Sequence, residues 1–348
     1  MAIEIIGTGK AVPPRRVSND DLAARIDTSD EWIRSHTGIG SRHIADEHTS
    51  CSDLALEASK NALAMVAGFS GENREERDRA SAKAAKSIDI IILGTTTPDF
   101  FGCPSTACIV QDKIGADRAG AMDIVAGCTG FVYGLETAAG LLNISKERKR
   151  ALIIGSETLS KITDWNDRGT CVLFGDGAGA AVIEKTTAPS EGQQRRGLIR
   201  SMICSDGSGS ESLLFRRGGS RNPFKAGETL EKGIVVEMNG QEVYNFAVKA
   251  VTDTVAALME AEGITADDIA WIIPHQANAR IVQAARKRLK IPEEKFFLNI
   301  EEYANTSAAT IPIALDELNR NGQLKKGDMI MTVGFGAGLT YGGNIIIW

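Results

Sequence analysis

The stretch MDIVAGCTGFVYGLETAAGLL, residues 122–142, shows the alternation of strand and helix that is expected along the whole chain. It predicts a buried strand, then a bare Gly-Cys-Thr-Gly elbow, then a helix. The glycines leave the thiol of Cys128 unshielded, and the free N–H groups at the start of the helix point at its sulfur. Such a position favours a lowered thiol pKa and a nucleophilic thiolate. The alternative is a small buried cysteine at a tight strand–helix packing point.

Outward from this stretch, short apolar runs alternate with Ala-rich segments of helical length. This alternation predicts a layered α/β protein with buried strands. A helix is expected over 50–67, and the charged segment 70–87 is expected to be a solvated helical or disordered insertion. The predicted strands are 88–94, 120–125, 150–156, 179–183, 270–274 and 329–333.

The composition is that of an ordinary soluble globular chain. Of 348 residues, 43% are hydrophobic and 24% are charged, and the formal net charge is -6. These values give no global attraction to nucleic acid or membrane, and the apolar runs are too short to span a bilayer. The N-terminus lacks the pattern of a signal peptide. Six scattered cysteines without a C-x-x-C pair favour a reducing compartment, so a cytoplasmic location is expected.

A faint internal repeat has the same order in both halves. A strand, a functional group at a strand end and a Gly-rich turn into a strand occur in residues 1–188 and again in residues 189–348. Strand ends of a duplicated unit meet near a pseudo-twofold axis, where open sheets place ligands. We therefore expect Cys128 from the first half to converge with His275 and Asn305 from the second.

His275 and Asn305 both follow predicted strands, in the segments WIIPHQAN and EYANTSAA. A histidine at such a strand exit can exchange protons with a pocket, and Thr306 or Ser307 is available to cap the next helix. Taken singly, His275 can equally be a structural histidine and Asn305 a turn residue.

With these motifs in view, the sequence resembles the β-ketoacyl-acyl-carrier-protein synthase III enzymes of the thiolase superfamily. The resemblance runs nearly end to end, and only the 70–87 insertion looks foreign. It implies a thiolase-like fold, in which two duplicated α/β halves form a layered αβαβα architecture. The further matching motifs are DTSDEWIRSHTGI at 27–39, DRGTCVLFGDGAGAAV at 167–182, MNGQEV at 238–243 and GFGAG at 334–338.

The resemblance implies a ping-pong decarboxylative Claisen condensation that starts fatty-acid synthesis. Cys128 would take an acyl group from acyl-CoA as a thioester. His275 and Asn305 would then hydrogen-bond the thioester carbonyl of malonyl-acyl-carrier protein as carbon dioxide leaves. The backbone N–H groups of Cys128 and Ala337 would form the oxyanion hole.

Further roles also follow from the resemblance alone. It implies a homodimer with a continuous sheet, and no cofactor beyond the CoA thioester substrate. Acyl-carrier proteins are acidic, so a basic docking helix is expected. The implied CoA-binding residues are Trp32, Arg168, Gly240 and Asn278, and the implied carrier-binding residues are Arg280, Arg286, Lys287 and Arg288.

Three positions depart from the family pattern. His36 stands where many members have an arginine on the adenine, and Asn245 where a carrier-docking lysine is common. Cys103 lies in a lengthened loop where an aromatic residue often limits the acyl pocket. A short acyl primer is expected, while longer or branched primers, or a starter-unit transfer in specialised metabolism, stay open.

The sequence gives less support to other kinds of site and function than to a condensing enzyme. His43, His48 and Cys51 match no standard zinc spacing, so no metal is expected. The glycine-rich segments form neither a dinucleotide fingerprint nor a phosphate loop. Simple acyl transfer or thioester hydrolysis by the same thiol, and a non-enzymatic scaffold that binds carrier protein, are the remaining alternatives.

Overall fold

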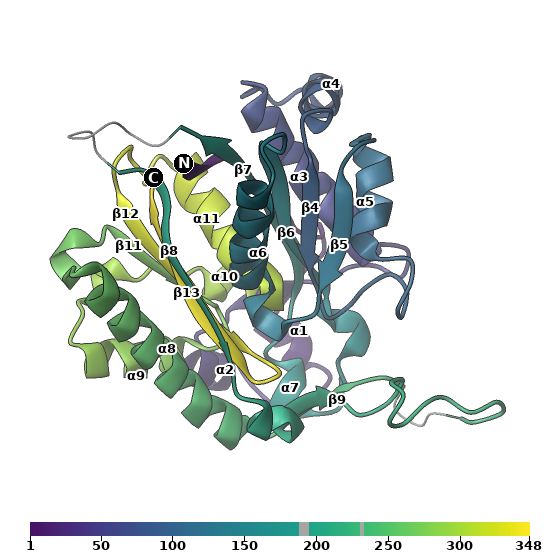
Figure 1. The fold of residues 1–348 in the computed structure, drawn as a ribbon. Coiled ribbons are helices and arrows are strands. Elements are labelled where there is room, and N and C mark those ends of the chain that lie inside the picture. Colours follow the sequence, from purple (N-terminus) through teal and green to yellow (C-terminus); the bar gives the residue numbers. More distant parts are fainter. Residues whose placement is uncertain (188–194, 230–232) are drawn as a thin grey trace.

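Two β-sheets with helices before, between and behind them make up the molecule (Figure 1). The structure, a computed structural model, describes residues 1–187, 195–229 and 233–348. The expected boundary between residues 188 and 189 lies outside the described residues. No helix in the described ranges is long and apolar enough to cross a membrane.

The first sheet has five strands in the order β1-β7-β6-β4-β5. β4 pairs in parallel with both β5 and β6, whereas β7 is antiparallel to β6 and to β1. Its strands are β1 (Ala2–Ala11), β4 (Ile90–Gly94), β5 (Gly120–Ile124), β6 (Arg150–Thr158) and β7 (Asp176–Thr186).

The second sheet repeats this pattern in the order β11-β12-β13-β8. A parallel pair is again followed by two antiparallel pairs, as in β4-β6-β7-β1. A parallel bridge from Ile272 to Phe296 takes the place that β5 has beside β4. The faint sequence repeat therefore corresponds to one strand topology used twice. The strands are β8 (Gly197–Ser205), β11 (Trp271–Pro274), β12 (Met329–Gly336) and β13 (Thr340–Ile347).

Helices complete the five layers of the expected αβαβα architecture. α6 (Gly130–Ile144) and α11 (Thr310–Arg320) lie between the sheets, and their apolar side chains share one core with both. α3 (Cys51–Val66) and α5 (Thr106–Ile114) cover the outer face of the first sheet. α8 (Gly240–Glu262) and α9 (Ala279–Leu289) cover the outer face of the second.

Smaller elements surround the ends of the sheets. They include two short antiparallel pairs, β2 with β3 and β9 with β10. These strands are β2 (Arg16–Ser18), β3 (Ser41–His43), β9 (Leu213–Phe215) and β10 (Val236–Met238). The short helices are α1 (Asn19–Ala23), α2 (Asp30–Thr37), α7 (Arg168–Cys171) and α10 (Ile300–Tyr303), with 3-10 turns at Gly127–Thr129, Leu159–Ile162, Gly207–Ser212, Ala266–Asp268, Glu293–Lys295 and Ser307–Ala309.

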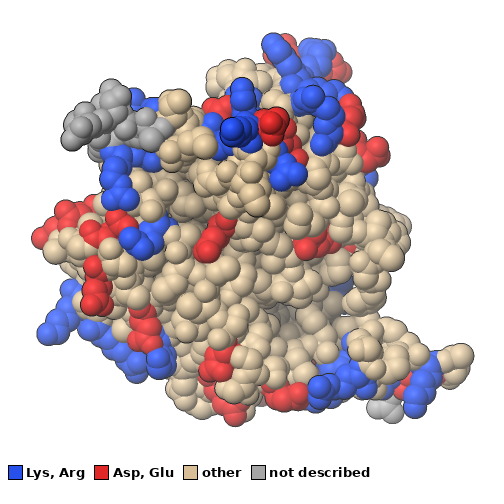
Figure 2. Space-filling view, in the orientation of Figure 1, with Lys and Arg blue, Asp and Glu red and all other residues tan. Residues whose placement is uncertain are grey.

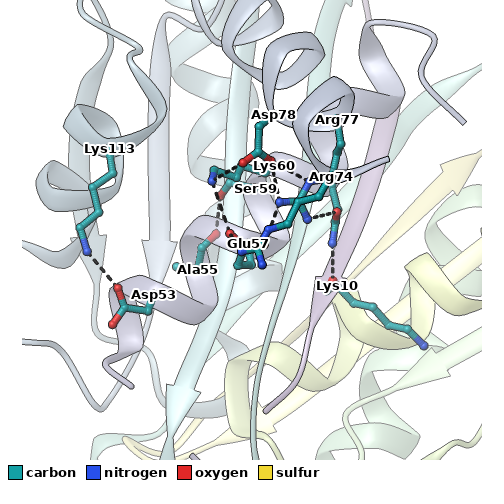
Figure 3. Close-up of polar contacts among 11 residues, drawn as sticks. Lys10, Asp53, Ala55, Glu57, Ser59, Lys60, Arg74, Arg77, Asp78 and Lys113 are labelled. Atoms are coloured by element: carbon teal, nitrogen blue, oxygen red, sulfur yellow. Dashed lines mark hydrogen bonds and ion pairs between the residues drawn. The ribbon is translucent and has the colours of Figure 1, made fainter. Parts of the chain in front are cut away.

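The charged insertion forms a helix, α4 (Arg74–Ala85), rather than a disordered segment. Asn73 caps its first turn, and Ala84 and Ala85 are buried in the outer core. Arg77 reaches back to α3, where its Nη2 lies 2.9 Å from Glu57, and Lys60 lies 3.0 Å from Asp78 (Figure 3). Polar pairs therefore dock a helix that has almost no large apolar residue.

One strand differs from its prediction. β5 was expected to be buried, but it is the edge of the first sheet and its side chains are only partly covered. Met122 is 39% exposed, and Val125, just after the strand, is 82% exposed. An apolar run cannot by itself distinguish a central strand from an edge strand.

Candidate active site

The elbow at Cys128 forms as predicted, because only glycine fits beside it. β5 ends at Ile124, a 3-10 turn spans Gly127–Thr129, and α6 begins at Gly130. Gly127 has a φ of 52°, and a Cβ there would lie 2.7 Å from the backbone nitrogen of Ala337. A Cβ at Gly336 would likewise lie 2.5 Å from the backbone nitrogen of Cys128. Both glycines thus let the two halves of the molecule meet at the thiol.

A cavity of about 490 Å³ brings the three predicted catalytic residues together. Its lining includes Cys128 from the elbow, His275 from the end of β11 and Asn305 from the segment before α11. The backbone of Ala337 also lines it, beside Cys128. The duplicated topology explains this meeting, since corresponding strand ends of the two halves face each other.

His275 is buried and fixed on three sides. Its backbone N–H donates to Val333 at 2.8 Å, and its ring packs edge-on against Phe335 with centroids 5.0 Å apart. Ring nitrogen Nδ1 lies 2.7 Å from the hydroxyl oxygen of Thr310. Burial lowers the pKa of His275 to about 3, so the imidazole is neutral near pH 7.

Asn305 is held so that its amide can donate into the cavity. Its backbone bonds to Leu173 and Gly175, and its side-chain Oδ1 accepts the backbone N–H of Ser307 at 2.8 Å. With Oδ1 occupied, Nδ2 is the free end of the amide. The predicted capping by Thr306 or Ser307 is wrong: α11 has no side-chain cap, and the turn before it is satisfied by Asn305 instead.

The cavity lining also contains the residues expected to contact CoA. Trp32, Arg168, Gly240 and Asn278 all line it. The Arg168 guanidinium carbon lies 4.5 Å from the centre of the Trp32 ring. His36 stacks on the same indole at 4.4 Å, so the residue that departs from the family pattern still contacts Trp32. Asn278 caps α9 and donates to the carbonyl of His36 at 3.1 Å.

Comparison with known proteins agrees with this geometry. The family model described as 3-oxoacyl-[acyl-carrier-protein (ACP)] synthase III matches residues 122–207, and the model of its C-terminal part matches residues 259–348. A β-ketoacyl-[acyl-carrier-protein] synthase III from Caldanaerobacter subterraneus is 47% identical over 349 residues, covering 100% of this chain and 98% of the relative. The chain belongs to the β-ketoacyl-acyl-carrier-protein synthase III family.

Other synthase III proteins give the same result. One from Clostridium perfringens is 49% identical over 344 residues, covering 99% of this chain and 98% of the relative. The solved synthase III structure from Aquifex aeolicus has a TM-score of 0.84 at 37% identity and covers 99% of this chain and 100% of its own. That from Thermus thermophilus has a TM-score of 0.85 at 39% identity and covers 99% of both chains. This synthase is therefore a condensing acyltransferase with the thiolase fold.

One electrostatic expectation for this synthase is wrong. The thiol pKa of Cys128 was expected to be lowered, but burial raises it to about 12. The carboxyl of Glu157 acts in the same direction, and a hydrogen bond with the Ser307 side chain opposes both. In the free enzyme the sulfur is therefore a thiol, and its proton must be removed as it attacks.

Sequence reasoning missed three residues of the synthase site. Glu157 is buried at the end of β6, where burial raises its pKa, and it accepts hydrogen bonds from Thr97 at 2.6 Å and from the Ser307 side chain. Ser307 and Thr310 lie against Cys128 and His275 respectively. An acidic residue two positions after the apolar run 151–155 was the only visible signal for Glu157.

The predicted carrier-docking residues differ in exposure and in whether they are already paired within the chain. Arg280, Lys287 and Arg288 are exposed on α9, and Arg280 also lines the cavity mouth. Arg286 is engaged within the chain, since its guanidinium lies 2.6 Å from Glu293. No metal-binding cluster of His, Cys, Asp and Glu occurs among the described residues.

Proposed function

We propose that this synthase condenses an acyl-CoA primer with malonyl-acyl-carrier protein through an acyl-Cys128 thioester, and thereby initiates fatty-acid synthesis. The observation that carries the proposal is the meeting of a thiol, a neutral imidazole and a free amide donor in one cavity. A nucleophile, a proton acceptor and a hydrogen-bond donor are the groups that covalent acyl transfer followed by enolate formation requires.

In the first half-reaction, the Cys128 sulfur attacks the thioester carbonyl of acyl-CoA. The negative charge on the carbonyl oxygen is stabilised by the N–H groups of Cys128 and Ala337, whose backbones adjoin in the structure. The bond from the carbonyl carbon to the CoA sulfur then breaks, and CoA leaves as a thiol with the proton that Cys128 lost.

In the second half-reaction, malonyl-acyl-carrier protein takes the place of CoA. Asn305, together with His275, hydrogen-bonds its thioester carbonyl and stabilises the enolate while carbon dioxide leaves. The enolate carbon attacks the acyl carbonyl on Cys128. The carbon–sulfur bond to the enzyme breaks, and the cysteine thiolate takes up a proton. The chemistry needs no metal or cofactor beyond these two thioesters.

The CoA nucleotide is proposed to stack at Trp32, with Arg168 beside it. An indole offers a broad apolar face to adenine, and a guanidinium 4.5 Å away can pair with phosphate. The pantetheine would pass Gly240 and Asn278 toward Cys128, since all of these residues line one continuous cavity. Acyl-carrier protein would dock on the exposed cations of α9 at the mouth, namely Arg280, Lys287 and Arg288.

A homodimer is proposed because one face of the chain is apolar and open. β5 has a free edge, and four exposed apolar side chains lie near it in the fold: Met122 on β5, Val125 just after it, Ile144 at the end of α6 and Ile203 on β8. Figure 2 shows that the middle of this face is mostly uncharged. Val125 also lines the cavity, so a second copy paired at β5 would close the site. Light scattering of the purified protein measures its molecular mass in solution and so distinguishes a dimer from a monomer.

We also propose a cytoplasmic location, supported by six cysteines that are all free. Reduced thiols are the normal state of cysteine in that compartment.

The decisive experiment incubates the protein with acyl-CoAs from acetyl to decanoyl, straight and branched, and records intact mass. We expect one acyl adduct, absent in Cys128→Ser and present in the control Cys204→Ser, and the preferred chain identifies the primer. Carbon dioxide release from malonyl-acyl-carrier protein then separates condensation from simple acyl transfer. An adduct without carbon dioxide release contradicts the condensing function and leaves acyl transfer.

A further inference from the structure

One short turn of backbone orients both polar partners of Cys128. Ser307 has a φ of 49°, in the left-handed region that side-chain-bearing residues seldom adopt. Its N–H donates to Oδ1 of Asn305 at 2.8 Å. Its carbonyl accepts the hydroxyl of Thr310 at 3.0 Å, and that hydroxyl oxygen lies 2.7 Å from Nδ1 of His275.

In the resting enzyme these contacts favour one position for the proton of the His275 ring. A hydroxyl group has one proton to donate, and that of Thr310 is directed at Ser307. Toward His275 the hydroxyl oxygen is therefore an acceptor, so Nδ1 carries the proton and Nε2 presents a lone pair. Thr310 is only 3% exposed and His275 only 1%, so bulk water does not replace this contact.

We propose that Thr310 is a positioning residue that makes His275 the proton acceptor for Cys128 in acyl transfer, while the N–H of Ser307 makes Asn305 the donor. This assignment rests on the proposed function. As sulfur attacks acyl-CoA, the thiol proton moves to Nε2. When the bond to CoA breaks, the same proton moves from Nε2 to the departing CoA sulfur, and His275 is neutral again.

The two half-reactions then make opposite demands on His275. Acyl transfer needs a lone pair on Nε2, whereas hydrogen bonding to the malonyl carbonyl needs a proton there. The Thr310 hydroxyl can also turn and donate to Nδ1. Ser307 stays bonded in that case, because its carbonyl also accepts the backbone N–H of Thr310. A hydroxyl at position 310 is thus compatible with either tautomer, whereas a methyl group leaves a proton on Nδ1 without an acceptor and so favours the tautomer with the proton on Nε2.

Nitrogen NMR of the resting enzyme tests the tautomer directly. The chain has only four histidines, so ¹⁵N-histidine labelling with a His275→Ala spectrum assigns the signal. We expect a protonated Nδ1 and an unprotonated Nε2 in wild type. A protonated Nε2 in the free enzyme overturns the proposal.

A matched pair of variants tests the consequence. Thr310→Val keeps the shape and removes the hydroxyl, whereas Thr310→Ser keeps the hydroxyl. We expect Thr310→Val to slow formation of the acyl-Cys128 adduct by about 100-fold, the scale of lost general-base catalysis, and Thr310→Ser to restore most of the rate. In a Cys128→Ala background, Thr310→Val should change carbon dioxide release from malonyl-acyl-carrier protein by less than about threefold, because Asn305 and a proton on Nε2 supply the donors.

The outcomes separate this proposal from the proposed function. Equal loss in both half-reactions, or Thr310→Ser as slow as Thr310→Val, means that Thr310 is merely structural and overturns the proposal. If wild type forms no adduct with any CoA and releases no carbon dioxide, the proposed function fails. The NMR tautomer then still decides whether Thr310 sets the proton on His275.

Discussion

Two clusters of ionisable side chains in this chain differ in whether their groups carry charge. On the surface, Glu57 and Lys60 of α3 meet Arg77 and Asp78 of α4 as paired charges beside water (Figure 3). In the cavity, burial raises the pKa of Cys128 and lowers that of His275, which leaves both groups neutral near pH 7. The surroundings of a group, together with its residue type, decide whether it carries charge.

The surface cluster keeps its charges because opposite partners outweigh burial. Partial burial alone would raise the pKa of Asp78, but its bonds to Arg77 and Lys60 lower it overall. For the thiol of Cys128 and the imidazole of His275, burial is the leading influence, and no opposite charge among the described residues offsets it. The first cluster therefore fastens one helix to another, and the second provides neutral groups that exchange protons during a reaction.

The largest effect is expected when the cavity loses its fixed donor. Asn305→Ala removes Nδ2 from the malonyl carbonyl and should lower carbon dioxide release by roughly 100- to 1,000-fold, as loss of one oxyanion donor does. Adduct formation from acyl-CoA should fall much less. Asn321→Ala, at an exposed position, is the control, and an unchanged decarboxylation rate in Asn305→Ala contradicts the assigned role.

The pH dependence of thiol alkylation is the next test. With a pKa of about 12, the thiolate fraction of Cys128 should rise about tenfold per pH unit. Iodoacetamide labelling at Cys128, followed by peptide mass spectrometry, should therefore increase steadily from pH 7 to 10. Exposed Cys103 and Cys108 serve as internal references. A plateau at Cys128 below pH 9 would show that the helix N-terminus lowers its pKa after all.

The smallest effect is expected at the surface cluster. Arg77→Ala breaks partly buried ion pairs and should reduce the free energy of unfolding by about 1 kcal/mol, with a smaller loss at high salt. Arg79→Ala is the matched control, since its pair with Glu75 is 3.9 Å long and highly exposed. Denaturant unfolding measures both. A loss above about 3 kcal/mol in Arg77→Ala would mean that the cluster behaves as a buried network.

Much of the fold could be read from local patterns. All six predicted strands and the helix expected over 50–67 occur within a few residues of their predicted bounds, because apolar runs and caps such as Ser50 act locally. The edge position of β5 could not be predicted, since an apolar run does not record whether a strand is paired on one side or on both. The sequence also did not decide whether the insertion 70–87 is helical or disordered, since ion pairs with α3, which are not local contacts, hold its helix in place.

The sequence by itself determined the elbow at Cys128, the repeat and the residue types at His275 and Asn305, because glycine, cysteine and strand-exit patterns act over a few residues. Only the tertiary structure decided the protonation of the site. Burial, a function of the whole packed core, raised the pKa of Cys128, and contacts between distant segments placed Thr310 and Glu157 beside the reacting groups. Solvation and long-range hydrogen bonds depend on the complete fold, so no local pattern records them.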